Sequence, residues 1–139
     1  LGLFTGDPGP NPDQNAVGRI LTYKLSGEKT LPPATVITKR QPDIADTDAS
    51  PETIEQGRAL FLDRCSWCHG YDTIGNGSFP DLRYSDATTH SLWNSIVIDG
   101  AYVGKGMPSY SSVLTEDDAQ AIRAYVIRQG RIAFDSDTE

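Results

Sequence analysis

The sequence predicts a mostly α-helical domain preceded by an extended arm. Residues 1–50 are rich in Pro, Gly, Asp and Thr, which do not sustain helices. Residues 51–131 instead contain segments with helix-start signals and apolar residues at helical spacing. With 139 residues, the chain has material for about one domain and an extension. We therefore expect an arm (1–50), a helical domain (51–131) and an acidic tail (132–139).

The arm contains one clear strand pattern. Residues 19–25 alternate, with Leu21, Tyr23 and Leu25 on one side. Ser26-Gly27 can turn the chain, and residues 35–38 are suited to a second short β segment. Because two short pieces do not form a stable sheet, the strand needs another surface to lie on.

The first helix is predicted from Pro51 to about Arg64. Ser50 is a suitable N-cap, proline is favoured at the first helical position, and Glu52 complements the helix dipole. One stripe of this helix collects three residues at helical spacing: Ile54, Gly57 and Phe61.

Two further helices follow. One is expected over residues 88–98, ahead of Gly100, and would turn four residues inward: Leu92, Trp93, Ile96 and Val97. The last opens at Thr115-Glu116-Asp117-Asp118, runs to about Gln129 and is expected to stop at Gly130. Its buried residues would be Ile122, Tyr125 and Val126.

Composition and net charge limit the classes of function that the chain can have. Hydrophobic residues make up 37% of the chain, and no run approaches the roughly 20 apolar residues of a membrane span. A net charge of −7 argues against nucleic acid as a partner. It permits steering toward a basic partner, but a solvated acidic face explains each cluster equally well. The start at Leu1, without Met or a leader pattern, indicates a processed chain or a piece of a longer one.

The most informative stretch is Cys65-Ser66-Trp67-Cys68-His69. C-x-x-C-H is the attachment pattern of c-type haem, because two thiols on one helical turn can bond to the two vinyl groups of a porphyrin edge. The histidine then lies beneath the iron. Both cysteines of the chain belong to this motif. We therefore predict one covalent haem c on Cys65 and Cys68, with His69 as an iron ligand.

The motif has three other interpretations. A thioredoxin-like redox pair would follow a buried strand, whereas a helix pattern precedes Cys65. A structural zinc site needs about four N or S ligands, and the chain has two Cys and two His in all. An exposed, fortuitous motif would leave an unused pair of thiols.

The sixth iron position has two candidate ligands. Met107 is the only methionine and lies in a loop between Gly106 and Pro108, which is an unusual place for a packing methionine. His90, near a predicted helix start, is the rival, and bis-histidine ligation would lower the reduction potential. An open position would suggest peroxidase or gas-binding chemistry, but no distal acid–base pair is evident. Electron transfer through a His69/Met107 iron is therefore the favoured interpretation.

Residues 52–130 resemble a class I cytochrome c domain. The landmarks of that family occur in order: Gly57 and Phe61 in the first helix, Cys65, Cys68 and His69, residues 79–82, Met107, and Tyr125 in the last helix. The resemblance implies that the first and last helices cross at Gly57, with Phe61 and Tyr125 packed there. It also implies that the Pro80 carbonyl accepts a hydrogen bond from His69 Nδ1, and that Leu82 packs on the haem face.

Buried haem propionates need hydrogen-bond donors. Arg83, which follows the Pro80 turn, and Trp93, through an inward indole N–H, are the candidates. A surface arginine and a core tryptophan explain the same residues equally well.

Three segments are similar to the C-terminal cytochrome domain of quinohaemoprotein alcohol dehydrogenases: 79–84, 96–101 and 106–108. Residues 18–27 and 31–33 resemble the end of the propeller and the start of the linker in those enzymes. In that family, an eight-bladed propeller holding pyrroloquinoline quinone (PQQ) precedes the cytochrome on one chain. The resemblance therefore implies that this chain is the electron-transfer module of a PQQ-dependent dehydrogenase.

Several expectations follow from that resemblance. PQQ, its calcium and the substrate base would lie in a propeller module, so this chain alone would oxidise no alcohol. The reduced propeller module would donate electrons, and a small redox protein or a quinone would accept them. Thioether attachment in c-type cytochromes takes place outside the bacterial cytoplasm, which implies export to the periplasm. A free periplasmic cytochrome shuttle and a small haem peroxidase are the alternatives.

Overall fold

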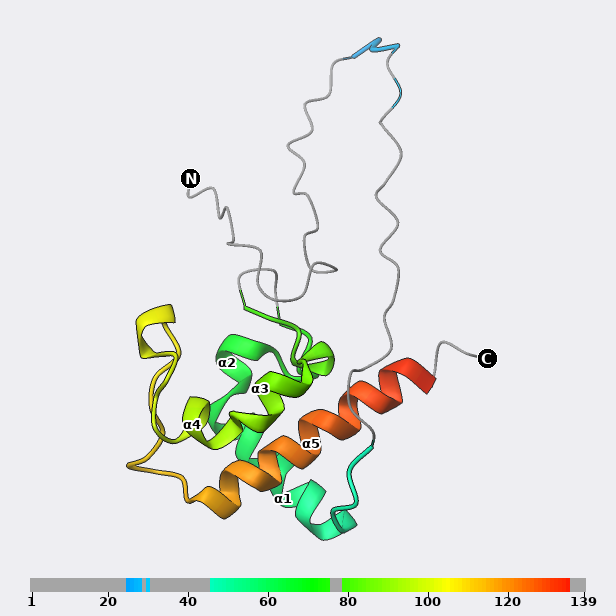
Figure 1. Cartoon of the computed structure of the whole chain (residues 1–139). Coiled ribbons are helices and arrows are strands. Elements are labelled where there is room, and N and C mark those ends of the chain that lie inside the picture. Colours follow the sequence, from blue (N-terminus) through cyan, green and yellow to red (C-terminus); the bar gives the residue numbers. More distant parts are fainter. Residues whose placement is uncertain (1–24, 29, 31–45, 76–78, 136–139) are drawn as a thin grey trace.

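The computed structural model describes residues 25–28, 30, 46–75 and 79–135, and its helices form the body of the molecule (Figure 1). The described elements are α1 (Pro51–Arg64), α2 (Ser66–His69), the 3₁₀ turn η2 (Leu82–Tyr84), α3 (Ala87–Ser91), α4 (Trp93–Val97), the 3₁₀ turn η3 (Val103–Lys105) and α5 (Glu116–Asp135). Helix α5 contacts α1, α4 and η2. The strands predicted at 19–25 and 35–38 fall outside the described residues, apart from Leu25, which lies in a turn. None of the helices in the described ranges is long and apolar enough to cross a membrane.

Helix α1 confirms the prediction for its start and its end. Ser50 is the N-cap, and its side chain accepts a hydrogen bond from the backbone N–H of Thr53 at 3.2 Å. Pro51 opens the helix, where its missing N–H costs no hydrogen bond. After Arg64, the N–H of Cys65 still bonds to the Phe61 carbonyl at 2.8 Å. The chain therefore stays helical as it enters the cysteine motif.

Helices α1 and α5 cross at Gly57, as the resemblance implied. A Cβ atom at Gly57 would overlap the carbonyl group of Ala121 and lie 2.9 Å from the backbone nitrogen of Ile122. Beside this contact, the rings of Phe61 and Tyr125 pack with centroids 5.4 Å apart. The core cluster around them is formed by buried residues from α1, α4, α5 and the segment before α5: Phe61, Trp93, Val97, Leu114, Ala119, Ile122, Tyr125 and Val126.

The single helix predicted over residues 88–98 is instead two short helices. Asp86 caps α3, accepting a hydrogen bond from Thr89 N–H at 2.6 Å, and the backbone breaks at Leu92 with φ −96° and ψ 14°. The break leaves Leu92 48% exposed, so the prediction that it faces inward was wrong. The helix breaks at Leu92 because of a tertiary contact. Helix α4 is oriented to bury Trp93, whose indole N–H donates to the Ala119 carbonyl of α5 at 2.8 Å.

The predicted stop of the last helix at Gly130 was also wrong. Helix α5 continues through Gly130 to Asp135, so the first residues of the predicted acidic tail are helical. A Cβ at Gly130 would lie 2.6 Å from the Arg83 carbonyl oxygen. Glycine is needed there because η2 approaches the helix backbone, and not because the helix ends.

Candidate haem-binding site

The cysteine motif occupies one helical turn after α1. Amide hydrogen bonds to the Cys65 carbonyl come from Cys68 at 3.2 Å and from His69 at 3.0 Å. The Ser66 hydroxyl donates to the Leu62 carbonyl at 2.7 Å, which fixes the turn to the end of α1. Cys65 is half-buried against the core, and Cys68 is exposed. Both thiols are free, so both remain available for thioether formation.

The environment of Cys65 does not suit thiol–disulfide exchange. Burial raises the pKa of the Cys65 thiol to about 12, and the neighbouring Cys68 adds to this shift. Redox-active C-x-x-C pairs depend on the opposite, a lowered pKa that makes a nucleophilic thiolate. Within the described ranges, no three His, Cys, Asp or Glu side chains form a group able to hold a metal ion. The thioredoxin and zinc interpretations therefore gain no support.

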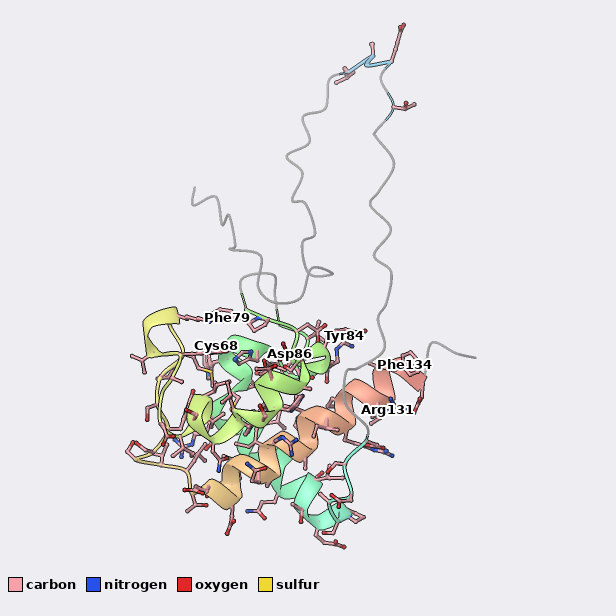
Figure 2. All side chains as sticks on the ribbon, in the orientation of Figure 1. Cys68, Phe79, Tyr84, Asp86, Arg131 and Phe134 are labelled. Carbon is pink, nitrogen blue, oxygen red and sulfur yellow. The ribbon has the colours of Figure 1, made fainter. Side chains whose placement is uncertain are left out.

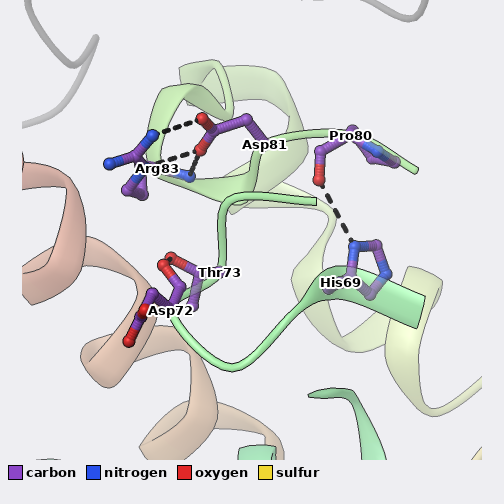
Figure 3. A network of polar contacts seen from close by, with 6 residues as sticks. All are labelled: His69, Asp72, Thr73, Pro80, Asp81 and Arg83. Atoms are coloured by element: carbon purple, nitrogen blue, oxygen red, sulfur yellow. Dashed lines mark hydrogen bonds and ion pairs between the residues drawn. The ribbon is translucent and has the colours of Figure 1, made fainter. Parts of the chain in front are cut away.

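His69 is oriented by the Pro80 carbonyl (Figure 3). Nδ1 lies 3.5 Å from that oxygen, and because a carbonyl only accepts, Nδ1 carries the hydrogen. Burial lowers the pKa of His69, while the contact with Pro80 works in the other direction. Burial thus favours the neutral ring, and with the hydrogen on Nδ1 the lone pair of Nε2 is left for a metal.

Arg83 and Asp81 form a closed pair beside this contact (Figure 3). The buried Asp81 carboxylate accepts hydrogen bonds from the Arg83 backbone N–H at 3.1 Å, from Nε at 2.9 Å and from Nη2 at 2.6 Å. The pair fixes η2 directly after Pro80. A propionate contact from Arg83 stays a prediction, with the guanidinium already oriented by Asp81.

Trp93 lies in the core. Its indole N–H, the only hydrogen it can donate, bonds to the Ala119 carbonyl at 2.8 Å. A bond from Trp93 to a propionate would require that contact to break, so this role also stays a prediction. The rival ligand His90 is 5% exposed and stacks on Trp93, with centroids 5.5 Å apart. His90 therefore packs from α3 against α4.

The loop that carries Met107 packs against the cysteine motif. Met107 and Tyr110 both contact the core cluster, as do Cys65 and Leu82. The Tyr110 hydroxyl donates to the Arg64 carbonyl at 3.0 Å, directly before Cys65. Burial raises the pKa of the Tyr110 hydroxyl, and the neighbouring thiols of Cys65 and Cys68 raise it further. Sequence reasoning missed Tyr110, since no local pattern indicates its contact with Arg64.

The surroundings of the motif fit a flat apolar macrocycle. Large apolar side chains there are left exposed: Trp67 (91%), Tyr71 (75%), Ile74 (46%), Phe79 (37%) and Val103 (57%). Cys68 and Phe79 lie on the same side of the molecule in Figure 2, and the Phe79 ring is 6.1 Å from that of His69. Leu82 and Met107 are partly buried and pack against the core cluster. Two thiols, an imidazole nitrogen and a thioether sulfur thus accompany an apolar wall, which is the donor set of a c-type haem.

A family model described as "Cytochrome C oxidase, cbb3-type, subunit III" matches residues 52–126, more than half of the chain. The chain belongs to this cytochrome c family. The match begins in α1 and ends within α5, so it contains the cysteine motif, the Pro80 segment and the Met107 loop.

Curated relatives extend the comparison beyond this domain. Quinohemoprotein alcohol dehydrogenase ADH IIB of Pseudomonas putida is 35% identical over 131 residues, 91% of this chain and 19% of that protein. Lupanine 17-hydroxylase [cytochrome c] of a Pseudomonas species is 32% identical over 120 residues, 85% of this chain and 17% of that protein. The solved structure of the P. putida quinohemoprotein alcohol dehydrogenase ADHIIG matches with a TM-score of 0.64 at 26% identity, covering 81% of this chain and 16% of that one. This chain therefore spans about one fifth of the length of the curated relatives it matches.

Proposed function

We propose that this chain is an electron-transfer module that carries one covalent haem c. The observation that supports this most directly is the packing of three pieces: the cysteine turn, the Pro80 segment that orients His69, and the loop of Met107 and Tyr110. A bound haem supplies a single-electron couple between ferric and ferrous iron. The surrounding protein has to hold it, orient its ligands and limit water.

Different residues of the site would carry out these tasks. Cys65 and Cys68 would hold a haem c through thioether bonds, and His69 would offer Nε2 to its iron while the Pro80 carbonyl fixes the imidazole ring. The Met107 thioether would be the second protein ligand of the iron, and a thioether favours ferrous iron. Leu82 would supply apolar surface against the bound haem.

Covalent attachment is tested by extraction. Acidified organic solvent should leave the haem with the polypeptide, because thioether bonds survive acid. Cys65→Ala and Cys68→Ala variants should each lose one bond and shift the pyridine haemochrome spectrum. Haem that partitions into the solvent from the unmodified protein would contradict the proposal.

The role of Met107 is tested by Met107→His. Exchange of thioether for imidazole should lower the reduction potential and remove the spectral features of sulfur ligation. Val113→His is the matched control, because Val113 is 51% exposed and lies six residues further along the chain. The same potential and spectrum in Met107→His as in the unmodified protein would place the ligand elsewhere.

The relatives named quinohemoprotein alcohol dehydrogenases suggest the physiological partner. We infer that a PQQ propeller module, with its calcium, reduces this domain, and that a small redox protein or a quinone then oxidises it. On this view the domain alone oxidises no alcohol, and thioether attachment places it in the periplasm. Residues 18–38 would lie at or near the junction with the propeller.

Reconstitution tests this partnership. Addition of the propeller module should give alcohol-dependent haem reduction. Deletion of residues 1–38 should weaken docking and leave the haem spectrum unchanged. A deletion that alters the haem spectrum but not docking would assign the arm to the cytochrome domain instead.

A further inference from the structure

The loop after the cysteine motif is fixed at both ends. The Gly75 N–H donates to the His69 carbonyl at 2.8 Å, so the loop returns to the end of α2. The Leu82 N–H donates to the Thr73 carbonyl at 2.9 Å, which ties the same loop to the segment after Pro80. The loop thus connects the histidine to the segment carrying its hydrogen-bond acceptor.

Gly75 is where the two segments touch. Its φ is +74°, in the left-handed region that favours glycine. A Cβ at this position would lie 2.8 Å from the Pro80 carbonyl oxygen and would overlap the Phe79 carbonyl oxygen. Both obstacles are backbone atoms, which cannot rotate away as the end of a side chain can. The Pro80 carbonyl can therefore occupy its observed position only because residue 75 has no side chain.

The nearby Thr73 shows that this geometry is imposed by the surroundings. Thr73 is 0% exposed and has φ +65°, an unfavourable conformation for a β-branched residue. Such strain persists only where packing and hydrogen bonds determine the backbone. The loop is therefore a fixed spacer between the motif and Pro80.

We propose that Gly75 is a positioning residue for His69, acting through the Pro80 carbonyl. The Nδ1–O distance of 3.5 Å is at the long end of the hydrogen-bond range, so a displacement of a few tenths of an ångström decides whether the bond exists. An acceptor at Nδ1 increases the electron density of the imidazole and so favours ferric iron. Gly75 thereby lowers the reduction potential. This inference rests on the proposed haem function.

The test compares three glycine-to-alanine variants of the haem-loaded protein. Gly75→Ala introduces both backbone strain and the clash with Pro80. Gly70→Ala introduces the strain without the clash, because Gly70 has φ +75° but the nearest atom to its Cβ would be 3.5 Å away. Gly104→Ala introduces neither, since nothing lies within 4 Å of that Cβ and no positive φ is present.

We expect Gly75→Ala to raise the midpoint potential and to speed the exchange of the His69 Nδ1 proton observed by NMR. Gly70→Ala should shift both readouts less, and Gly104→Ala should shift neither. Equal shifts in Gly70→Ala and Gly75→Ala would overturn the inference, because strain alone would then explain them. An unmoved potential in Gly75→Ala would overturn it as well.

A second measurement covers a Gly75→Ala variant that fails to accumulate. Hydrogen exchange in the unmodified protein should be slow at the amides of Gly75 and Leu82, and fast exchange at both would overturn the inference. The haem-extraction result separates this inference from the proposed function. Covalent haem with an unmoved potential contradicts only the role of Gly75, whereas absence of covalent haem contradicts both.

Discussion

The helix crossing of α1 and α5 differs from the haem-side loops, residues 70–75, 79–86 and 98–110, in what holds it together. At the crossing, backbone meets backbone at Gly57, and the Phe61 and Tyr125 side chains beside it are 0% and 3% exposed. The haem-side loops are joined by individual hydrogen bonds, and some of their large apolar residues stay exposed. At the crossing the apolar side chains are covered by protein alone, whereas several apolar side chains of the loops are left uncovered. Their exposed apolar surface would become buried with a bound macrocycle, which would then stabilise the folded state by mass action.

The largest expected effect on stability comes from adding a methyl group where α1 and α5 cross. In Gly57→Ala, the new methyl group would overlap the Ala121 carbonyl, and two helix backbones would have to separate. We expect the free energy of unfolding to fall by about 3 kcal/mol or more. Urea titration of the haem-loaded protein measures this, with Gly104→Ala as the control. A loss as small as that of the control would mean that the helices do not meet at Gly57.

An intermediate effect is expected where α5 meets the haem-side loops. In Gly130→Ala, the Cβ would lie 2.6 Å from the Arg83 carbonyl, but η2 is a short turn and can move more easily than a helix. We expect a loss of about 2 kcal/mol in urea titration, accompanied by a shift in reduction potential, because η2 follows Pro80. A loss of stability without any change in potential would show that the two regions are independent.

This comparison also explains what could be predicted from the sequence. Helix α1 was predicted correctly because its signals are local: the Ser50 cap, Pro51, and the apolar stripe. The cysteine motif was equally local. The break at Leu92 and the passage of α5 through Gly130 were missed because their causes are distant in sequence, in Ala119 and Arg83 respectively.

The candidate site shows the same division. The motif alone predicts the cysteines and His69, and family resemblance added the Pro80 contact. The contact of Gly75 with Pro80 and the hydrogen bond from Tyr110 to Arg64 had no signal in the sequence, because both depend on how loops fold over one another. The haem-side loops are therefore the part of the molecule where sequence patterns are least informative.

His90 connects α3 to α4. It stacks on Trp93, and its Nδ1 is buried without a hydrogen-bond partner. Burial lowers the pKa of His90 from its usual value near 6.5 to about 4, with the positive charge of Arg123 adding to this and Asp86 opposing it. The ring is therefore neutral in the folded protein around pH 6.

The smallest expected effect is the acid sensitivity of this contact. Below pH 6.5 His90 is protonated in the unfolded chain, whereas in the folded protein it becomes protonated only near pH 4. The free energy of unfolding therefore falls as the pH drops through this window. Between pH 6.5 and pH 5.5 the loss from this group should be about 1 kcal/mol. His90→Gln removes the titration, so the difference in unfolding free energy between the two proteins isolates His90 from the carboxylates. The unmodified protein should lose stability relative to His90→Gln as the pH falls. Parallel pH profiles would show that His90 does not titrate differently on folding, and that its contact between α3 and α4 is open to water.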